Sequence, residues 1–358
     1  MLRFCVFLTF GCWSSSLLAL ENIQLPPGFS IEVYAEVPNA RALALGDRGT
    51  LFVSNRRGHS VYAVVVDGDS TRTIELLDGL NSPNGIAYFD GDLYVAEIDR
   101  VTRYADIEAH LENVPEAEEL DIELPANKQH GWRYIGFGPD GKLYISIGAP
   151  CNICDRKGFA QIIRISPDGS GREIVANGVR NSVGFAWHPG TGDLWFTDNG
   201  RDMLGDDLPA DELNRVSEKG QHFGFPYCHA GDIRDPGFGS GKNCSDYRAP
   251  ALKLGPHVAA LGLRFYSGEM FPAEYRGQIF IAEHGSWNRS KKIGYRIMMV
   301  RLEDGDPVAY EPFATGWLQG QSVSGRPVDL LILPDGSMLV SDDHAGMVYR
   351  ISYAQSSN

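Results

Sequence analysis

Val183–Asn199, with the sequence VGFAWHPGTGDLWFTDN, combines an apolar strand, a polar turn and a second strand of aromatic and β-branched residues. The same order of features recurs loosely in five other stretches: Arg41–Asn55, Asn84–Glu97, Trp132–Gly148, Leu261–His284 and Val328–Asp343. Most copies are followed by a further strand, and the spacing between them is irregular. Repeats of this kind, with four strands to a unit, are typical of a β-propeller.

The six copies predict an all-β fold, a six-bladed β-propeller with four-stranded antiparallel blades. Phe29–Ala35 reads as a strand before the first copy, and we expect it to pair with the last blade and close the ring. Continuous helical periodicity is absent except at Ile107–Leu111 and Leu208–Leu213. Residues 21–358 are therefore predicted to form a single propeller domain.

Residues 1–20 have the pattern of a secretory signal peptide. Arg3 is the only charge before Glu21, Phe4–Phe10 is an apolar run, and small and apolar residues follow as far as Leu20. The run is too short to span a bilayer, and we find no other segment that could cross one. The alternative is a lipoprotein lipidated at Cys12. Cleavage and release predict a periplasmic or secreted protein.

Four cysteines remain after such cleavage, and they allow three connectivities. In an oxidising compartment we expect the pairs Cys151–Cys154 and Cys228–Cys244, each closing a loop. The Cys-Asn-Ile-Cys spacing is also compatible with a redox or zinc pair, although neither a βαβ context nor two further zinc ligands are visible nearby.

The chain is acidic, with 46 Asp and Glu against 32 Lys and Arg and a net charge of −14. This balance argues against nucleic acid and anionic lipid as partners. The simplest reading of the charge is solubility.

Three polar groups precede the first strand of their repeats, where one rim of a propeller gathers its loops. They are His130, the pair Arg180-Asn181, and Arg326. An imidazole can take a proton from a hydroxyl group near neutral pH. A guanidinium binds carboxylate in a bidentate manner. The alternatives are a loop histidine and salt bridges within the rim.

The run Gly178–Asn214 adds a dense acidic loop, Asp198–Glu212, after the second strand of the same copy. Calcium prefers carboxylate and backbone carbonyl oxygens, so the loop is a candidate cation site, although a solvated acidic loop is the alternative. Arg289 and Lys291 add positive charge after a strand of the next copy, beside Trp287. Together these groups predict a pocket for a polyanionic, carboxylate-bearing ligand.

The chain resembles the soluble quinoprotein sugar dehydrogenases, and within them the glucose/sorbosone dehydrogenases. The pieces that carry the resemblance are GVRNSVGFAWHPGTGDLWFTDNGR, DELNRV followed by HFGFPYC, EHGSWNRS followed by GYRI, and GRPVDLLILPDGSMLVSDD. They run in the family's order, from about Leu25 to Ile351. The resemblance implies a six-bladed propeller that uses pyrroloquinoline quinone and calcium.

The resemblance also implies roles for matching residues. His130 matches the general base that removes the substrate's hydroxyl proton. The carbonyls of Gly200 and Arg201 match calcium ligands.

On the cofactor side, Arg180 and Asn181 match the pair that holds the quinone. Arg326 matches a cofactor-binding arginine, and Arg289 roughly overlies a basic residue of the preceding blade.

Two positions depart from the family's pattern. Ala149 stands where glucose-oxidising members carry an aspartate that orients the catalytic histidine, so Asp155 is the alternative partner for His130. Val328 stands where a second arginine is expected, two residues after Arg326. These departures argue against glucose as the substrate.

The function expected from the sequence is oxidation of a sugar, sugar aldehyde or related alcohol, with a cytochrome or a quinone as electron acceptor. Two alternatives stand beside it: a non-catalytic propeller that binds a carbohydrate or protein, and a calcium-dependent lactonase-type hydrolase. The hydrolase would need carboxylates and amides around the channel, whereas this chain favours arginines.

Overall fold

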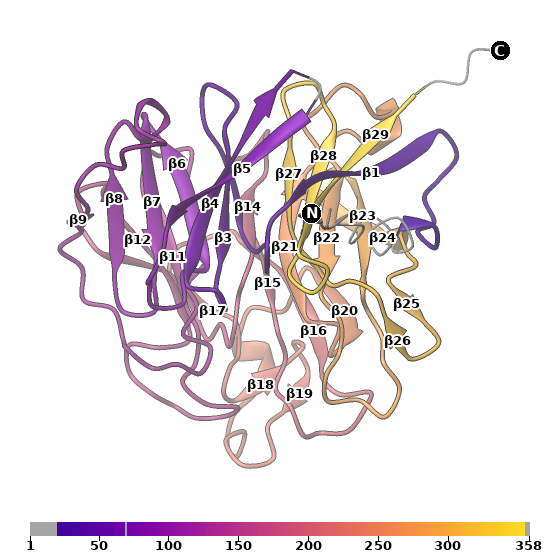
Figure 1. Ribbon diagram of the computed structural model, residues 1–358. Coiled ribbons are helices and arrows are strands. Elements are labelled where there is room, and N and C mark those ends of the chain that lie inside the picture. The colour runs from indigo at the N-terminus through magenta and orange to yellow at the C-terminus, as the bar shows by residue number, and fades with distance from the viewer. Residues whose placement is uncertain (1–19, 69, 355–358) are drawn as a thin grey trace, which may run out of the picture.

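The computed structural model describes residues 20–68 and 70–354 and contains the six-bladed propeller that the repeats predict (Figure 1). Blades 1 and 2 are the antiparallel sheets β2-β3-β4-β5 and β6-β7-β8-β9. Their strands are β2 (Leu43–Leu45), β3 (Leu51–Asn55), β4 (Ser60–Asp67), β5 (Ser70–Leu77), β6 (Gly85–Phe89), β7 (Asp92–Ala96), β8 (Val101–Tyr104) and β9 (Glu118–Glu119).

Blades 3 and 4 follow the same order, from an inner strand to an outer one. Their strands are β10 (Ile135–Phe137), β11 (Leu143–Ile147), β12 (Gln161–Ile165) and β13 (Glu173–Asn177), then β14 (Phe185–Trp187), β15 (Leu194–Asp198), β16 (Ala210–Val216) and β20 (Leu252–Pro256). Blade 3 also carries a short fifth strand, β17 (Gln221–His222), parallel to β13.

Blade 5 consists of β21 (Ala260–Phe265), β22 (Ile279–Glu283), β23 (Arg296–Glu303) and β24 (Asp306–Ala314). Blade 6 consists of β27 (Pro327–Ile332), β28 (Met338–Asp342), β29 (Met347–Tyr353) and β1 (Phe29–Glu36). β1 pairs with β29 in register from Phe29↔Tyr353 to Glu36↔Met347. The predicted closure of the ring by the strand before the first repeat is therefore confirmed.

Between the blades, the core is built from the large residue that recurs in each second strand. This residue is buried in all six blades: Phe52, Tyr94, Tyr144, Trp195, Phe280 and Leu339. Full burial of such a side chain contributes about 1.5–3 kcal/mol, which is why the pattern recurs although the rest of each repeat drifts.

From residue 21 onward, the described chain has helical structure only in three short 3-10 turns, Ile107–Ala109, Cys244–Asp246 and Ala273–Tyr275. The first falls in a stretch with weak helical periodicity, whereas Leu208–Leu213 leads into the strand β16. No helix among the described residues is long and apolar enough to cross a membrane. The predicted signal peptide lies outside the described residues except for Leu20.

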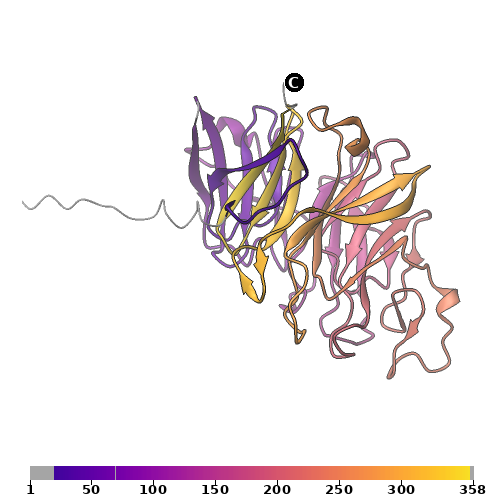
Figure 2. The same cartoon turned by 90° about the vertical axis from the view of Figure 1, so that its right-hand side faces the viewer.

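A long excursion between β16 and β20 lies at one edge of the ring (Figures 1 and 2). It holds β17 and the two-stranded ribbon of β18 (Cys228–His229) and β19 (Ile233–Arg234). A second ribbon, β25 (Leu318–Gln319) and β26 (Ser322–Val323), precedes blade 6.

Both expected disulfides are present. Cys151–Cys154 spans three positions in the loop after β11, and Cys228–Cys244 spans sixteen positions in the excursion. The alternative reading of Cys151 and Cys154 as a zinc pair finds no support, because the described residues contain no group of three or more possible metal-binding side chains.

In blades 4 and 6, a buried carboxylate at the end of the second strand accepts hydrogen bonds from the backbone that precedes the first strand. Asp198 accepts the backbone N–H groups of Arg180 and Asn181 at 2.8 and 2.6 Å. Asp342 accepts the N–H of Arg326 at 2.9 Å. The residues at the rim are therefore fixed through their backbones, which leaves their side chains free to face the central opening.

The closure of the ring depends on an aromatic cluster around Phe29, and we expect Phe29→Ala to weaken it. The ring of Phe29 meets Phe271, Phe313 and Tyr353 edge-on, with centroids 4.7, 5.1 and 4.9 Å away. Because Phe29 is partly exposed, the loss should lie near the low end of the range for such truncations, roughly 3 kcal/mol. The decrease in the free energy of unfolding is measured by denaturant unfolding.

Phe238→Ala, at an exposed ring in the excursion, is the matched control and should change the free energy of unfolding by less than about 0.5 kcal/mol. Equal losses in the two variants would contradict the assigned role of Phe29.

Candidate active site

A cavity of about 510 Å³ opens at the rim where first strands begin and second strands end. Five residues to which the sequence analysis gave a catalytic, cofactor or metal role line it: His130, Arg180, Asn181, Gly200 and Arg326. They come from blades 3, 4 and 6 and are far apart in the sequence, so the expected convergence of these loops is what the fold produces.

His130 is held in one orientation by the backbone of the next loop. Its Nδ1 lies 2.8 Å from the carbonyl oxygen of Ala149. A carbonyl can only accept, so Nδ1 carries the hydrogen and Nε2 keeps its lone pair. Burial, and then the charge of Arg180, lower the pKa of His130 to about 3. The imidazole is therefore neutral at physiological pH and offers one nitrogen as a base.

The missing aspartate is thus replaced by the main chain of Ala149, the residue that occupies its position. The alternative partner, Asp155, accepts a hydrogen bond from the hydroxyl of Tyr227 instead. Gly148 makes this approach possible, since a Cβ there would come within 2.7 Å of both the Cβ and the carbonyl oxygen of His130.

Arg180 is buried, and four of the five N–H groups of its guanidinium are bonded to the protein. Its guanidinium donates to the carbonyl and side-chain oxygens of Asn152, to the carbonyl of Asn199 and to the carboxylate of Asp202, all at 2.9–3.0 Å. Burial lowers its pKa against the opposing charges of Asp202 and Asp198. The guanidinium therefore has a fixed direction at the wall of the cavity. Beside it, the side-chain amide of Asn181 makes no hydrogen bond to any described residue.

A second group of arginines faces the cavity from blades 1 and 6, and sequence reasoning found only Arg326 among them. The others are Arg41, Arg56 and Arg57. Arg41 pairs with Asp343 at 2.9 Å. Arg326 donates to the carbonyls of His284 and Gly285 and lies over the ring of Tyr295.

Arg56 and Arg57 differ from Arg41 and Arg326, because neither guanidinium has a hydrogen-bond or ion-pair partner in the described chain; Arg57 is exposed, whereas Arg56 is partly buried. Arg56 lies 4.4 Å from the centroid of the Trp132 ring. Burial, and then the positive charges of Arg41, Arg57 and Arg326, lower the pKa of Arg56 to about 9, while Asp343 opposes the shift. This is the signature of a cation that lacks its anion.

Arg41, Arg56 and Arg57 could have been predicted from their positions relative to the strands of their repeat, as the other rim residues were. Arg41 lies shortly before the first strand of its blade, as His130 and Arg180 do, and Arg56-Arg57 follow the second strand as Gly200-Arg201 do.

The floor of the cavity is apolar. Val183 and Leu261 line it and pack with the buried Val328 and with Trp132. A flat ring system with charged edges fits such a site, since its faces meet apolar side chains and its edges meet guanidinium groups.

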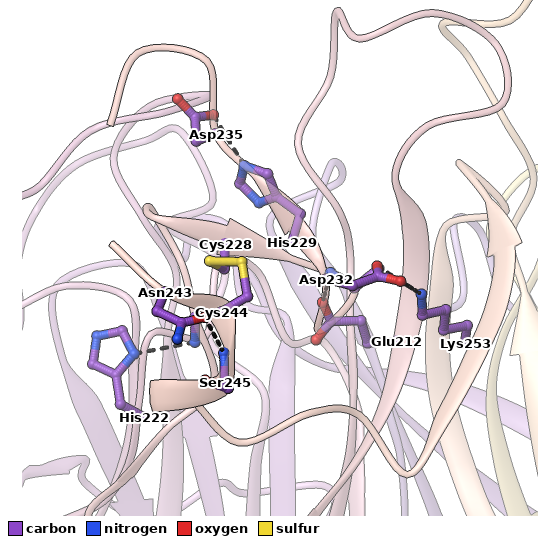
Figure 3. The surroundings of a disulfide bond; sticks show 12 residues. Glu212, His222, Cys228, His229, Asp232, Asp235, Asn243, Cys244, Ser245 and Lys253 are labelled. Carbon is purple, nitrogen blue, oxygen red and sulfur yellow. Dashed lines mark hydrogen bonds and ion pairs between the residues drawn. A yellow bond between two sulfur atoms is a disulfide. The ribbon is translucent and has the colours of Figure 1, made fainter. Parts of the chain in front are cut away.

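The predicted metal residues lie next to one another, and only one of them lines the cavity. Gly200 does so, and its N–H donates to Asp211 at 2.9 Å. Arg201 directs its guanidinium away to Asp235, which also contacts His229 (Figure 3). Neither carbonyl accepts a hydrogen bond from the described residues, so both remain available to a hard cation.

The acidic loop itself does not form a carboxylate cage. Asp198 and Asp211 accept backbone N–H groups, and Glu212 accepts the N–H of Ala230 near the Cys228–Cys244 disulfide (Figure 3). Burial raises the pKa of Asp211 and of Glu212 to about 7 in each case. A cation bound here would be coordinated by backbone carbonyl oxygens and by an anionic molecule bound in the cavity.

Arg289 is not brought into the cavity. Its guanidinium bonds the carbonyl of Asp206 and the carboxylate of Asp207, at the outer part of the acidic loop. Trp287, from the same segment, lines the cavity and is 69% exposed.

Two family models match the chain. The one described as glucose/sorbosone dehydrogenase matches residues 94–285, more than half of the sequence. The chain belongs to this family. A second model, described as TrAA12-like, matches residues 233–354 of the same family member.

This glucose/sorbosone dehydrogenase family member has similar proteins in several organisms. An uncharacterized protein of Borreliella burgdorferi is 34% identical, over 95% of this chain and 94% of that protein. The AA12 carbohydrate-active enzyme of Trichoderma reesei has a TM-score of 0.82 at 19% identity, over 93% and 98% of the two chains. The holo PQQ domain of Coprinopsis cinerea pyranose dehydrogenase has a TM-score of 0.80 at 19% identity, over 92% and 97%. These structures share the propeller fold.

The low pKa of His130 has a consequence for stability. Below the ordinary histidine pKa of 6.5, the unfolded chain binds a proton that the folded His130 refuses, so stability falls as the pH drops from 6.5 toward 3. His130→Gln should remove this loss. Between pH 7 and pH 5 it should lose about 1–2 kcal/mol less than the wild type, as measured by urea unfolding.

The exposed His110→Gln is the control and should follow the wild-type pH dependence. An identical pH dependence in His130→Gln and wild type would contradict a neutral, buried His130.

Proposed function

We propose that this protein is a quinoprotein dehydrogenase that oxidises a sugar, sugar aldehyde or related alcohol by hydride transfer to pyrroloquinoline quinone with calcium. The observation that carries the proposal is the cavity, where five arginines surround an apolar floor beside a neutral imidazole. The two disulfides support an oxidising compartment, the periplasm or the cell exterior.

The residues present fit this cofactor. Pyrroloquinoline quinone is a flat tricarboxylate, and the arginines of blades 1 and 6, above all Arg56, offer cations to its edge. Arg180 and Asn181 offer donors on the opposite side, and the carbonyls of Gly200 and Arg201 are available to calcium. When bound, the quinone supplies the two-electron acceptor, and calcium makes it more electrophilic.

His130 is placed to act as the base. Its Nε2 carries a lone pair because Nδ1 is committed to Ala149, so it can accept the hydroxyl proton of a substrate. The low pKa makes the nitrogen a weak base in the free protein. A bound polyanion would offset the charge of Arg180 and raise that pKa toward the range that general-base catalysis needs.

The relatives support a sugar as substrate, since pyranose dehydrogenase is among the structures with the same fold. The hydrolase alternative is disfavoured. Asp202 and Asp211 are the acids among the described lining residues, and both already accept hydrogen bonds from the protein.

The proposal is tested by cofactor binding and turnover. Purified apo-protein is titrated with pyrroloquinoline quinone and calcium, and dye reduction is followed with a panel of aldoses and sorbosone. Micromolar or tighter binding and turnover are expected. His130→Gln should keep the cofactor and lower kcat by about 10²–10⁴-fold. Absence of binding by the wild type would sink the proposal, and unchanged turnover in the variant would remove His130 from its role.

Arg56→Met should have opposite effects on the free and the loaded protein. Methionine keeps the packing on Trp132 and removes a desolvated charge beside other arginines, so the free energy of unfolding of the apo-protein should rise by about 1 kcal/mol. Loss of a charged hydrogen bond should raise the Kd for pyrroloquinoline quinone by about 10–150-fold.

The control is Arg72→Met, at an exposed arginine of the same blade that pairs with Glu112. It should leave the Kd within about twofold of the wild-type value. A wild-type Kd for Arg56→Met would exclude Arg56 from the cofactor site.

A further inference from the structure

The loop between β11 and β12, residues 148–160, has no regular structure but touches three parts of the site. The carbonyl of Ala149 receives Nδ1 of His130, and its N–H donates to the carbonyl of Arg180 at 2.8 Å. Three residues later, Asn152 bonds both Arg180 and Asp202. The candidate base, the cofactor arginine and the metal loop therefore share one short support.

Asn152 carries most of this support. Its carbonyl and Oδ1 each accept from the guanidinium of Arg180 at 2.9 Å, which makes two of the four bonds that fix that group. Oδ1 also accepts the N–H of Asp202 at 2.8 Å, and Nδ2 donates to the carbonyl of Asp202 at 3.0 Å. Asp202 directly follows Arg201, so the same amide positions the end of the predicted metal loop.

An irregular loop would ordinarily not hold an amide in one place, because fixing each residue costs about 1–2 kcal/mol of conformational entropy. Here the Cys151–Cys154 disulfide closes a ring around Asn152. The bond joins the residue before Asn152 to the second residue after it, and so restricts the backbone just where its carbonyl meets Arg180.

We propose that the Cys151–Cys154 disulfide is a positioning device for the site: it fixes Asn152, and Asn152 in turn fixes the guanidinium of Arg180 and the loop at Asp202. The cofactor-binding consequence rests on the function proposed above, whereas the effect on Arg180 does not. A bond that served only to stabilise the fold would leave Arg180 in place when it is removed.

Three variants test the idea: Asn152→Ala, the pair Cys151→Ser with Cys154→Ser, and the triple combination. The Kd for pyrroloquinoline quinone with calcium should rise about tenfold or more in each, which corresponds to about 1.4 kcal/mol. If the disulfide acts through Asn152, the triple variant should bind no more weakly than the weaker of the other two. Losses that add fully would overturn the proposed route.

The matched control is Cys228→Ser with Cys244→Ser, which opens the other disulfide. It is expected to lower the melting temperature and to leave the Kd within about twofold. If opening Cys151–Cys154 also lowers only the melting temperature, with an unchanged Kd, the bond is merely stabilising and the proposal fails.

A second measurement needs no cofactor. In the apo-protein, the Nε–H of Arg180 should exchange slowly with water, because it donates to Asn152. Asn152→Ala keeps the backbone carbonyl that accepts this N–H, so the deciding variant is the Cys151/Cys154 pair. In that variant the Nε–H signal in a nitrogen-15 NMR spectrum, assigned by its loss in Arg180→Lys, should exchange faster. Unchanged exchange would overturn the proposal. If the wild type binds no quinone, the proposed function fails while this measurement still decides the positioning role.

Discussion

The site depends on buried carboxylates that bond the backbone at the rim. Asp198 accepts hydrogen bonds from the backbone N–H groups of Arg180 and Asn181, and Asp342 accepts one from that of Arg326. Burial raises the pKa of both acids, so each would be costly without the N–H groups it accepts. The backbone of each rim residue is anchored within its own blade, and its side chain extends toward the central channel. The arrangement is not shared by every blade: in blade 3 the second strand ends at Ile147, and the N–H of Ala149 donates to the carbonyl of Arg180 in the next blade.

The fold could be predicted because it repeats. The large buried residue of the second strand could be recognised in all six copies of the repeat. One strand pattern before the first copy was enough to predict which strand closes the ring. Site residues could be predicted from the sequence only where the side chain itself indicates a chemical role, as at His130 and Arg180. His130 is oriented by the backbone carbonyl of Ala149. The residue type alanine gives no indication that its main chain has this role. The position of Arg289 could not be read for the converse reason: its charge is visible in the sequence, but its pairing with Asp206 and Asp207 depends on the fold.

The missing arginine at Val328 has a structural explanation. Val328 is buried and packs under Val183 and Leu261, which form the floor of the cavity. A guanidinium there would have to be desolvated beneath that floor. Blade 1 instead brings Arg56 to the same side of the cavity as Arg326, where their charges interact. Arginines of blades 1 and 6 thus supply positive charge on this side of the cavity without an arginine at position 328.

The closing strand gives this arrangement a further meaning. Blade 6 is completed by β1, and the chain from β1 leads directly into blade 1, so this strand alone joins the two blades covalently. Arg56 and Arg326 stand on opposite sides of that junction. An anion held by both would bind the closed ring and not an opened one, so its binding energy would add to the stability of the closure. The loaded protein should therefore resist opening most strongly at the junction where the two ends of the propeller meet.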